Sequence, residues 1–103
     1  MTERVVAFVP DLMDRSRILA VRSVEFVTSP VDLPVASAGA ALVIVDLGRP
    51  GVLEVLAQLS TPVVGFGSHV DRALLDAARA AGCDQVLTRS AFFSRLDQVL
   101  RLG

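Results

Sequence analysis

VIVDLGRPG, residues 43–51, places an acid at the end of an apolar run and a turn sequence directly after it. The run from Ala41 to Asp46 is short, apolar and rich in β-branched residues, which is typical of a strand buried in a parallel sheet. The Gly-Arg-Pro-Gly sequence that follows favours a tight turn. The stretch therefore predicts a central strand that ends on Asp46, which either terminates the strand and caps the turn or works in a site.

Short apolar runs and segments of helical period alternate along the rest of the chain. Four further strands are expected, at residues 4–10, 24–28, 61–66 and 84–88. Helices are expected after the five strands, at residues 11–21, 29–39, 52–59, 70–81 and 92–102. Pro30 and Pro34 favour a short or irregular second helix, and Gly82 is expected to end the fourth.

Five strands that alternate with five helices predict an α/β fold with helices on both faces of a parallel sheet. Right-handed crossovers favour a doubly wound sheet with strand order 2-1-3-4-5. The chain has 103 residues, of which 52% are hydrophobic and 20% charged, and no linker or repeat divides it. We therefore expect one folded domain over residues 1–103, with no output domain.

Charge and hydropathy exclude several classes of partner. The net charge is -1, so no basic excess indicates binding to nucleic acid or to an anionic membrane. No apolar run approaches the ~20 residues that span a bilayer, and no secretory signal is recognisable. The single cysteine, Cys83, is expected to be a small buried thiol. We expect a cytoplasmic protein.

Candidate site residues follow the strands, because sites in such sheets form at the carboxyl ends near the switch in strand order. The first and third strands are expected to be neighbours, so Asp11 and Asp46 would face one crevice. Their carboxylates and the backbone carbonyl of Gly48 are oxygen ligands of the kind that Mg²⁺ binds. Asp11 is equally suited to cap the helix that follows it, and Asp14 lies one helical turn later as another carboxylate for the site.

Other residues that could take part in binding or catalysis lack the partner residues that such a site requires. The sequence Gly65-Phe66-Gly67 has no third glycine to complete a dinucleotide-binding motif. His69 is the only histidine and has no Cys or His partners for a metal cluster. Ser16 and Ser90 have no evident base and orienting acid, so no hydrolase triad can be assembled. We therefore expect a protein that is not an enzyme.

The chain resembles the receiver domain of bacterial two-component response regulators over nearly its full length. The resemblance rests on Asp11 after the first strand, Asp46 ending the third, Pro50 four residues later, and Arg89 closing the fifth. It also rests on the sequences PVVGF and DAARAAGCDQVL. The resemblance implies a flavodoxin-like fold, a histidine kinase as partner, and phosphorylation of Asp46 in the presence of Mg²⁺.

Three positions depart from the pattern of that family. The acid pair after the first strand is here Pro10-Asp11, and the hydroxyl position after the fourth strand is Gly67, with Ser68 one residue late. The lysine position is Arg89, whose planar guanidinium is not equivalent to a lysine ammonium. These departures predict a pseudo-receiver, a stand-alone signalling and protein-interaction module that works without phosphorylation and requires no cofactor. In that case we expect Arg89 to pair with Asp46 in place of the metal.

Two alternatives stay open. One is a functional single-domain response regulator that is phosphorylated on Asp46 with Mg²⁺. The other is a small-ligand or nucleotide-binding module that uses the same crevice.

The resemblance also implies an interaction face made by the fourth helix, the fifth strand and the fifth helix. We expect a homodimer or another protein partner to bind there. Mixed charge is also usual on any solvated helix. The charged residues expected on this face are Asp71, Arg72, Arg79, Arg95, Asp97 and Arg101.

Overall fold

The computed structural model describes residues 3–101 and contains one five-stranded sheet. Its strands are β1 (Val5–Phe8), β2 (Glu25–Phe26), β3 (Leu42–Asp46), β4 (Val63–Gly67) and β5 (Gln85–Thr88). All pairings are parallel and the order is β2-β1-β3-β4-β5, which confirms the predicted topology. The helical elements are α1 (Leu12–Leu19), the 3₁₀ turn η1 (Pro30–Asp32), α2 (Leu33–Ala36), α3 (Val52–Leu56), α4 (Arg72–Ala80), α5 (Arg89–Ser94) and α6 (Leu96–Leu100).

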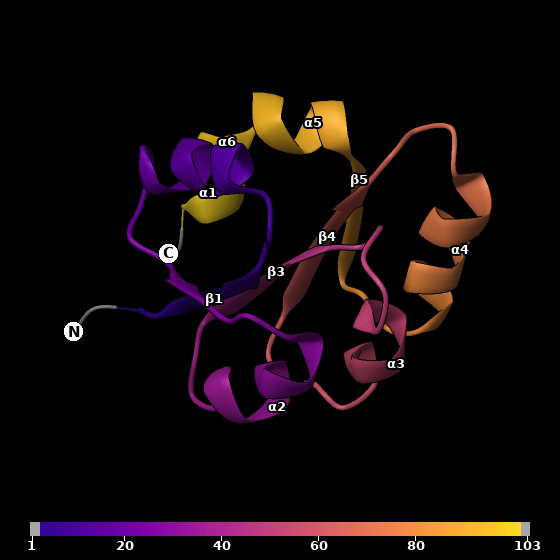
Figure 1. The fold of residues 1–103 in the computed structure, drawn as a ribbon, viewed down its shortest axis with the longest axis horizontal. Coiled ribbons are helices and arrows are strands. Elements are labelled where there is room, and N and C mark those ends of the chain that lie inside the picture. The colour runs from indigo at the N-terminus through magenta and orange to yellow at the C-terminus, as the bar shows by residue number, and fades with distance from the viewer. Residues whose placement is uncertain (1–2, 102–103) are drawn as a thin grey trace.

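The helices form two layers, with α1, α5 and α6 on one face of the sheet and α2, α3 and α4 on the other (Figure 1). Successive side chains of a strand point to opposite faces, so the apolar runs of β1 and β3 supply both cores. The core beside α2, α3 and α4 receives Val6, Phe8, Val43 and Val45. The core beside α1, α5 and α6 receives Val5, Ala7, Leu42 and Ile44.

An aromatic cluster joins β4 to α5. The rings of Phe66 and Phe92 are stacked with their centroids 4.6 Å apart. Phe93 meets both rings edge-on, at 5.4 Å from Phe66 and 4.9 Å from Phe92. Such contacts add to the free energy of burial, so they hold the start of α5 firmly against the sheet.

The last predicted helix, 92–102, differs from the structure at its start and by a break within it. Helix formation begins at Arg89, because the hydroxyl of Thr88 accepts a hydrogen bond from the Ala91 N–H at 3.2 Å and caps α5 directly after β5. The helix then breaks at Arg95, which has φ -119° and ψ 23°, and resumes as α6. The predicted end at Leu102 lies outside the described residues.

This break changes the predicted interaction face. Asp97 and Arg101 line a hollow with Val21 and Arg22, near the end of α1, and the Arg22 guanidinium donates to the Leu100 carbonyl at 2.9 Å. These two residues therefore belong to the face of α1 and α6 rather than to that of α4 and β5.

Several elements are shorter than the sequence suggests. Strand β2 pairs over two residues only, and it lies at the edge of the sheet with β1 as its sole neighbour among the described strands. In α1 the apolar residues Leu12 and Leu19 are 73% and 49% exposed, while Ile18 is buried. Helix α4 lies within its predicted range, 70–81, and Gly82, with φ 99°, follows its end as expected. No helix within residues 3–101 is both long and apolar enough to cross a bilayer.

The double-sided burial of β3 predicts a large difference between two substitutions to alanine. Ile44 is fully buried in β3, so Ile44→Ala is expected to lower the free energy of unfolding by about 2–5 kcal/mol. Leu12→Ala removes a side chain of similar size from an exposed position and should change it by less than about 0.5 kcal/mol. Urea denaturation of the two variants measures both values, and equal losses would contradict the burial of β3.

Candidate functional site

Asp46 ends β3 at the carboxyl edge of the sheet, as predicted, and its side chain is 13% exposed. Its Oδ1 accepts a hydrogen bond from the Gly48 N–H at 3.1 Å, and its Oδ2 accepts one from Nε of Arg49 at 3.2 Å. Both carboxylate oxygens are therefore occupied by groups of the loop that follows. Asp46 acts here as a cap of its own turn.

Asp11 lies beside the same edge and caps α1. Its Oδ1 accepts a hydrogen bond from the Asp14 N–H at 3.0 Å, so the predicted capping role is confirmed. This backbone hydrogen bond, more than any other group, holds the pKa of Asp11 below its ordinary value. A second backbone hydrogen bond from Met13 and the positive charges of Arg89 and Arg49 act in the same direction.

Asp14 is the most buried acid of the site. The residue is 2% exposed, and its Oδ1 accepts a hydrogen bond from Nη2 of Arg89. The same contact is an ion pair in which the Arg89 side chain is 46% exposed. The hydrogen bond from Arg89 to Asp14 is the main cause that raises the pKa of Arg89. Oδ2 of Asp14 is buried without a hydrogen-bond partner among the described residues.

The predicted ion pair between Arg89 and Asp46 is wrong: Arg89 binds Asp14, and Asp46 binds Arg49. The reason lies in packing, because α1 turns Asp14 inward toward the start of α5. The Arg89 guanidinium is supported there by two aromatic rings, at 5.6 Å from the centroid of Phe66 and 5.1 Å from that of Phe93.

The two positions at the end of β4 lack a hydroxyl directed at Asp46. A Cβ atom at Gly67 would lie 3.2 Å from Cδ2 of Leu75, so a larger residue there requires the Leu75 side chain of α4 to move by a few tenths of an ångström. Ser68 is exposed, and its Oγ accepts a hydrogen bond from the Val70 N–H at 3.4 Å within its own loop. Side chains of α4 thus pack closely against this position.

The donor set at this edge does not fit a divalent cation as it stands. Within residues 3–101, no three His, Cys, Asp or Glu side chains are grouped closely enough to hold a metal ion. Of the three acids, Asp14 and Asp46 each bind a guanidinium, and Asp11 binds the N-terminus of α1. The predicted ligand Gly48 turns its N–H toward Asp46. Two arginines therefore supply the positive charge beside these carboxylates.

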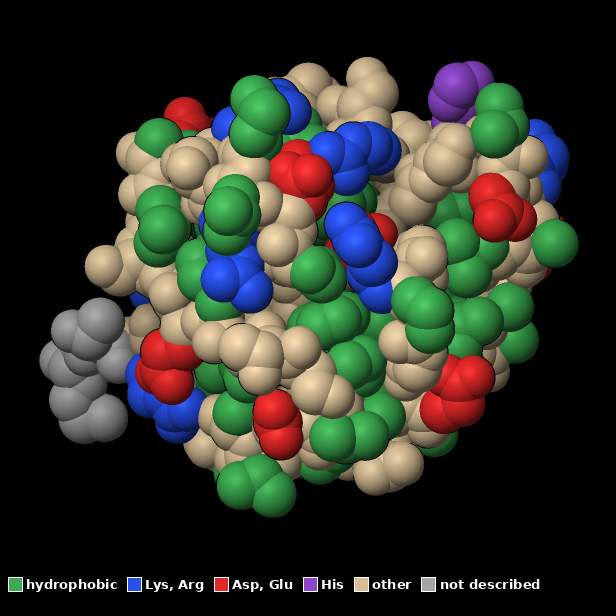
Figure 2. All heavy atoms as spheres, viewed as in Figure 1, with side chains coloured by type: hydrophobic (Ala, Val, Ile, Leu, Met, Phe, Trp, Pro, Cys, Tyr) green, Lys and Arg blue, Asp and Glu red, His purple; other side chains and the backbone are tan. Residues whose placement is uncertain are grey.

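Two arginines were absent from the sequence-based site. Arg49 lies three residues after Asp46, and this spacing could have indicated the pair. Arg17 lies with its guanidinium carbon 4.0 Å from the ring centroid of Phe93, a contact between α1 and α5 that no sequence signal indicates. Basic and acidic side chains lie side by side near the middle of the face seen in Figure 2.

Cys83 is buried, as predicted, and burial raises the pKa of its thiol.

The buried Asp14 predicts that Arg89 contributes to stability. Arg89→Gln leaves the Asp14 carboxylate without its cation and is expected to lower the free energy of unfolding by about 1–3 kcal/mol. Combining it with Asp14→Asn should recover part of the loss, because the buried charge is then removed. A double-mutant cycle in urea measures the coupling, and purely additive effects would contradict the pairing. Arg101→Gln is the control for loss of one charge at an exposed site.

No family model and no curated protein sequence matches the chain, but solved structures do. A response regulator from Hahella chejuensis is 23% identical, with a TM-score of 0.76 over 99% of this chain and 100% of its own. The phosphorylated cyanobacterial phytochrome response regulator RcpA is 18% identical, with a TM-score of 0.75 over 96% and 89%. A Mn²⁺-bound response regulator is 12% identical, with a TM-score of 0.76 over 99% and 98%. The chain has the fold of response-regulator receiver domains.

Proposed function

We propose that this chain is a receiver-like signalling module that acts through a protein partner and without phosphorylation of Asp46. The observation that carries the proposal is the pairing of Arg89 with Asp14 rather than with Asp46. Arg89 stands where the resembled family has a lysine beside the phosphoryl group. Its positive charge is already committed to a buried acid.

Phosphoryl transfer to Asp46 would require a carboxylate oxygen to attack phosphorus while positive groups neutralise the phosphoryl oxygens. In this chain Arg49 and the Gly48 N–H hold the two oxygens of Asp46. If Arg89 moved to the phosphoryl group, it would leave Asp14 buried and unpaired, which costs about 1–3 kcal/mol. This cost works against both acceptance of the phosphoryl group and a switch that depends on it.

Treatment with a small phosphodonor tests the proposal against the phosphorylated alternative. We expect no added phosphate when the protein is incubated with acetyl phosphate and Mg²⁺ and its intact mass is measured. A competent receiver domain treated in parallel shows that the reagent is active. An adduct on the native chain that is missing from Asp46→Asn would instead support a functional response regulator, the partner of a histidine kinase.

The proposed partner surface lies over α4 and β5, and its proposed occupant is a second copy of this chain. A groove of about 360 Å³ runs there, with both signs of charge from Arg72, Asp76 and Arg79. Arg79 pairs with Asp76 on the same helix at 3.0 Å, so each copy carries alternating charges. Two such faces related by a twofold axis can place acids of one copy against arginines of the other.

Sedimentation velocity at micromolar concentration tests this interface. We expect a dimer that Arg72→Glu weakens, because the reversed charge faces like charge in the partner. Arg101→Glu is the matched control, since Arg101 lies near the end of α1 and outside the groove. A monomer under these conditions, or a dimer equally sensitive to both substitutions, would contradict the proposal.

A further inference from the structure

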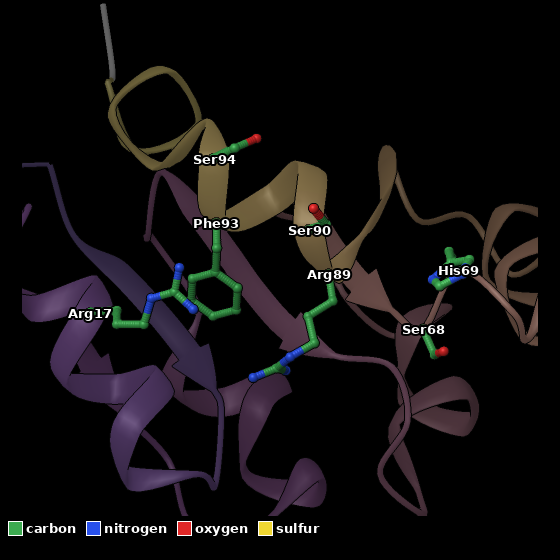
Figure 3. A pocket seen from close by; sticks show the side chains of 7 residues that line it. All are labelled: Arg17, Ser68, His69, Arg89, Ser90, Phe93 and Ser94. Carbon is green, nitrogen blue, oxygen red and sulfur yellow. The ribbon is translucent and has the colours of Figure 1, made fainter.

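A second hollow, of about 530 Å³, opens between α1, the loop after β4 and α5 (Figure 3). Asp11 and Asp46 do not line it, so it adjoins the crevice at the end of β3 through Arg89 without including the acids that face that crevice. We propose that this hollow binds the phosphate group of a small soluble organic phosphate. The inference extends the proposed function by giving the module a ligand, and it does not depend on the state of Asp46.

Two guanidinium groups from different elements meet in this hollow. Arg17 comes from α1 and Arg89 from α5, and their Cζ atoms lie 4.0 and 5.1 Å from the centroid of one ring, that of Phe93. The attraction between a guanidinium and a ring does not consume its N–H groups as hydrogen-bond donors, so these stay available for a ligand. Figure 3 shows Arg17 beside the Phe93 ring and the Arg89 side chain extending across the hollow.

The hollow carries a net positive charge although the chain as a whole is weakly acidic, because Asp14 balances the charge of Arg89 while Arg17 stays unpaired among the described residues. No Asp or Glu is among the described residues that line it. Within residues 3–101 Arg17 forms no ion pair, and Arg89 donates only through Nη2, to Asp14. The remaining donors of both arginines can bind phosphate oxygens in the two-pronged geometry that suits a guanidinium.

Hydroxyl groups add donors around the same space. Ser90 and Ser94 lie four residues apart on α5, which brings them to one side of the helix, and Ser68 comes from the loop after β4. The Ser94 hydroxyl donates its hydrogen bond to the Ala91 carbonyl at 3.0 Å and is therefore not free to donate to a ligand. Ser68 accepts from the Val70 N–H, which leaves its own proton free to donate. Ser68 and Ser90 are therefore the hydroxyls that can bind an anion.

The size of the hollow favours an organic phosphate over the bare ion. Its volume falls within the ~300–1,000 Å³ that is usual for small-molecule sites. Phe93 supplies an aromatic wall beside the two arginines. A ligand with a phosphate and an attached ring or chain can thus use both the charged and the apolar parts of the lining, as a nucleotide does.

Isothermal titration with ADP and with pyrophosphate, in separate experiments at low ionic strength, tests the inference. We expect saturable one-to-one binding that Arg17→Gln weakens about tenfold or more, because it removes a charged donor. Arg17 is exposed and forms no ion pair among the described residues, so this variant should fold normally. Arg101→Gln removes the same charge outside the hollow and should change the affinity by less than about twofold.

The controls separate this inference from the proposed function. Asp46→Asn is expected to leave the affinity unchanged, because Asp46 does not line the hollow. Tighter binding of ADP than of pyrophosphate supports the site, whereas equal or tighter binding of pyrophosphate would contradict the preference for an organic phosphate. Absence of saturable binding at millimolar concentrations would overturn it, as would equal weakening by Arg17→Gln and Arg101→Gln or dependence on Asp46. None of these readouts measures phosphorylation, so the inference and the proposed function can fail independently.

Discussion

Burial of β3 on both faces is the constraint on which the rest of the structure depends. Four consecutive apolar residues, 42–45, are almost fully inaccessible to solvent, and each contributes about 1.5–3 kcal/mol when buried. The stability of a whole domain is about 5–15 kcal/mol, so neither face of this strand can be left in water. Both layers of helices follow from this requirement, because each covers one set of alternating side chains. The same strand carries Asp46 to the carboxyl edge, where the chain must turn.

Charge pairing at that edge is set by burial in the same way. Asp14 has a nearly inaccessible side chain, and a buried carboxylate requires a cation or hydrogen-bond donors. Arg89 meets the requirement from the start of α5, where the rings of Phe66 and Phe93 support it. Asp46 therefore binds only groups of the loop that follows it, the Gly48 N–H and the Arg49 guanidinium. The buried Asp14 on α1 thereby decides which carboxylate Arg89, at the start of α5, binds.

The aromatic cluster links this pairing to the second hollow. Phe93 packs on Phe66 and Phe92 and also contacts the guanidiniums of Arg17 and Arg89. The ring therefore fixes two positive groups from helices that are far apart in the sequence. A receiver fold carries here a set of anion donors that does not involve the acid at the end of β3. The crevice and the hollow share Arg89 but differ in their other residues.

The sequence by itself determined the strand order, the two helical layers and the place of Asp46, and it gave capping as one of two roles for Asp11. These features depend on local periodicity, on chain connectivity and on residues a few positions apart, all of which can be read along the chain. Only the tertiary structure decided that Arg89 binds Asp14, that the Leu75 side chain of α4 packs beside Gly67, and that Arg17 reaches Phe93. Each of these depends on which face of a helix turns inward and how far a long side chain extends. Packing between distant segments settles both, and a single acid such as Asp14 looks the same in sequence whether it is buried or in water.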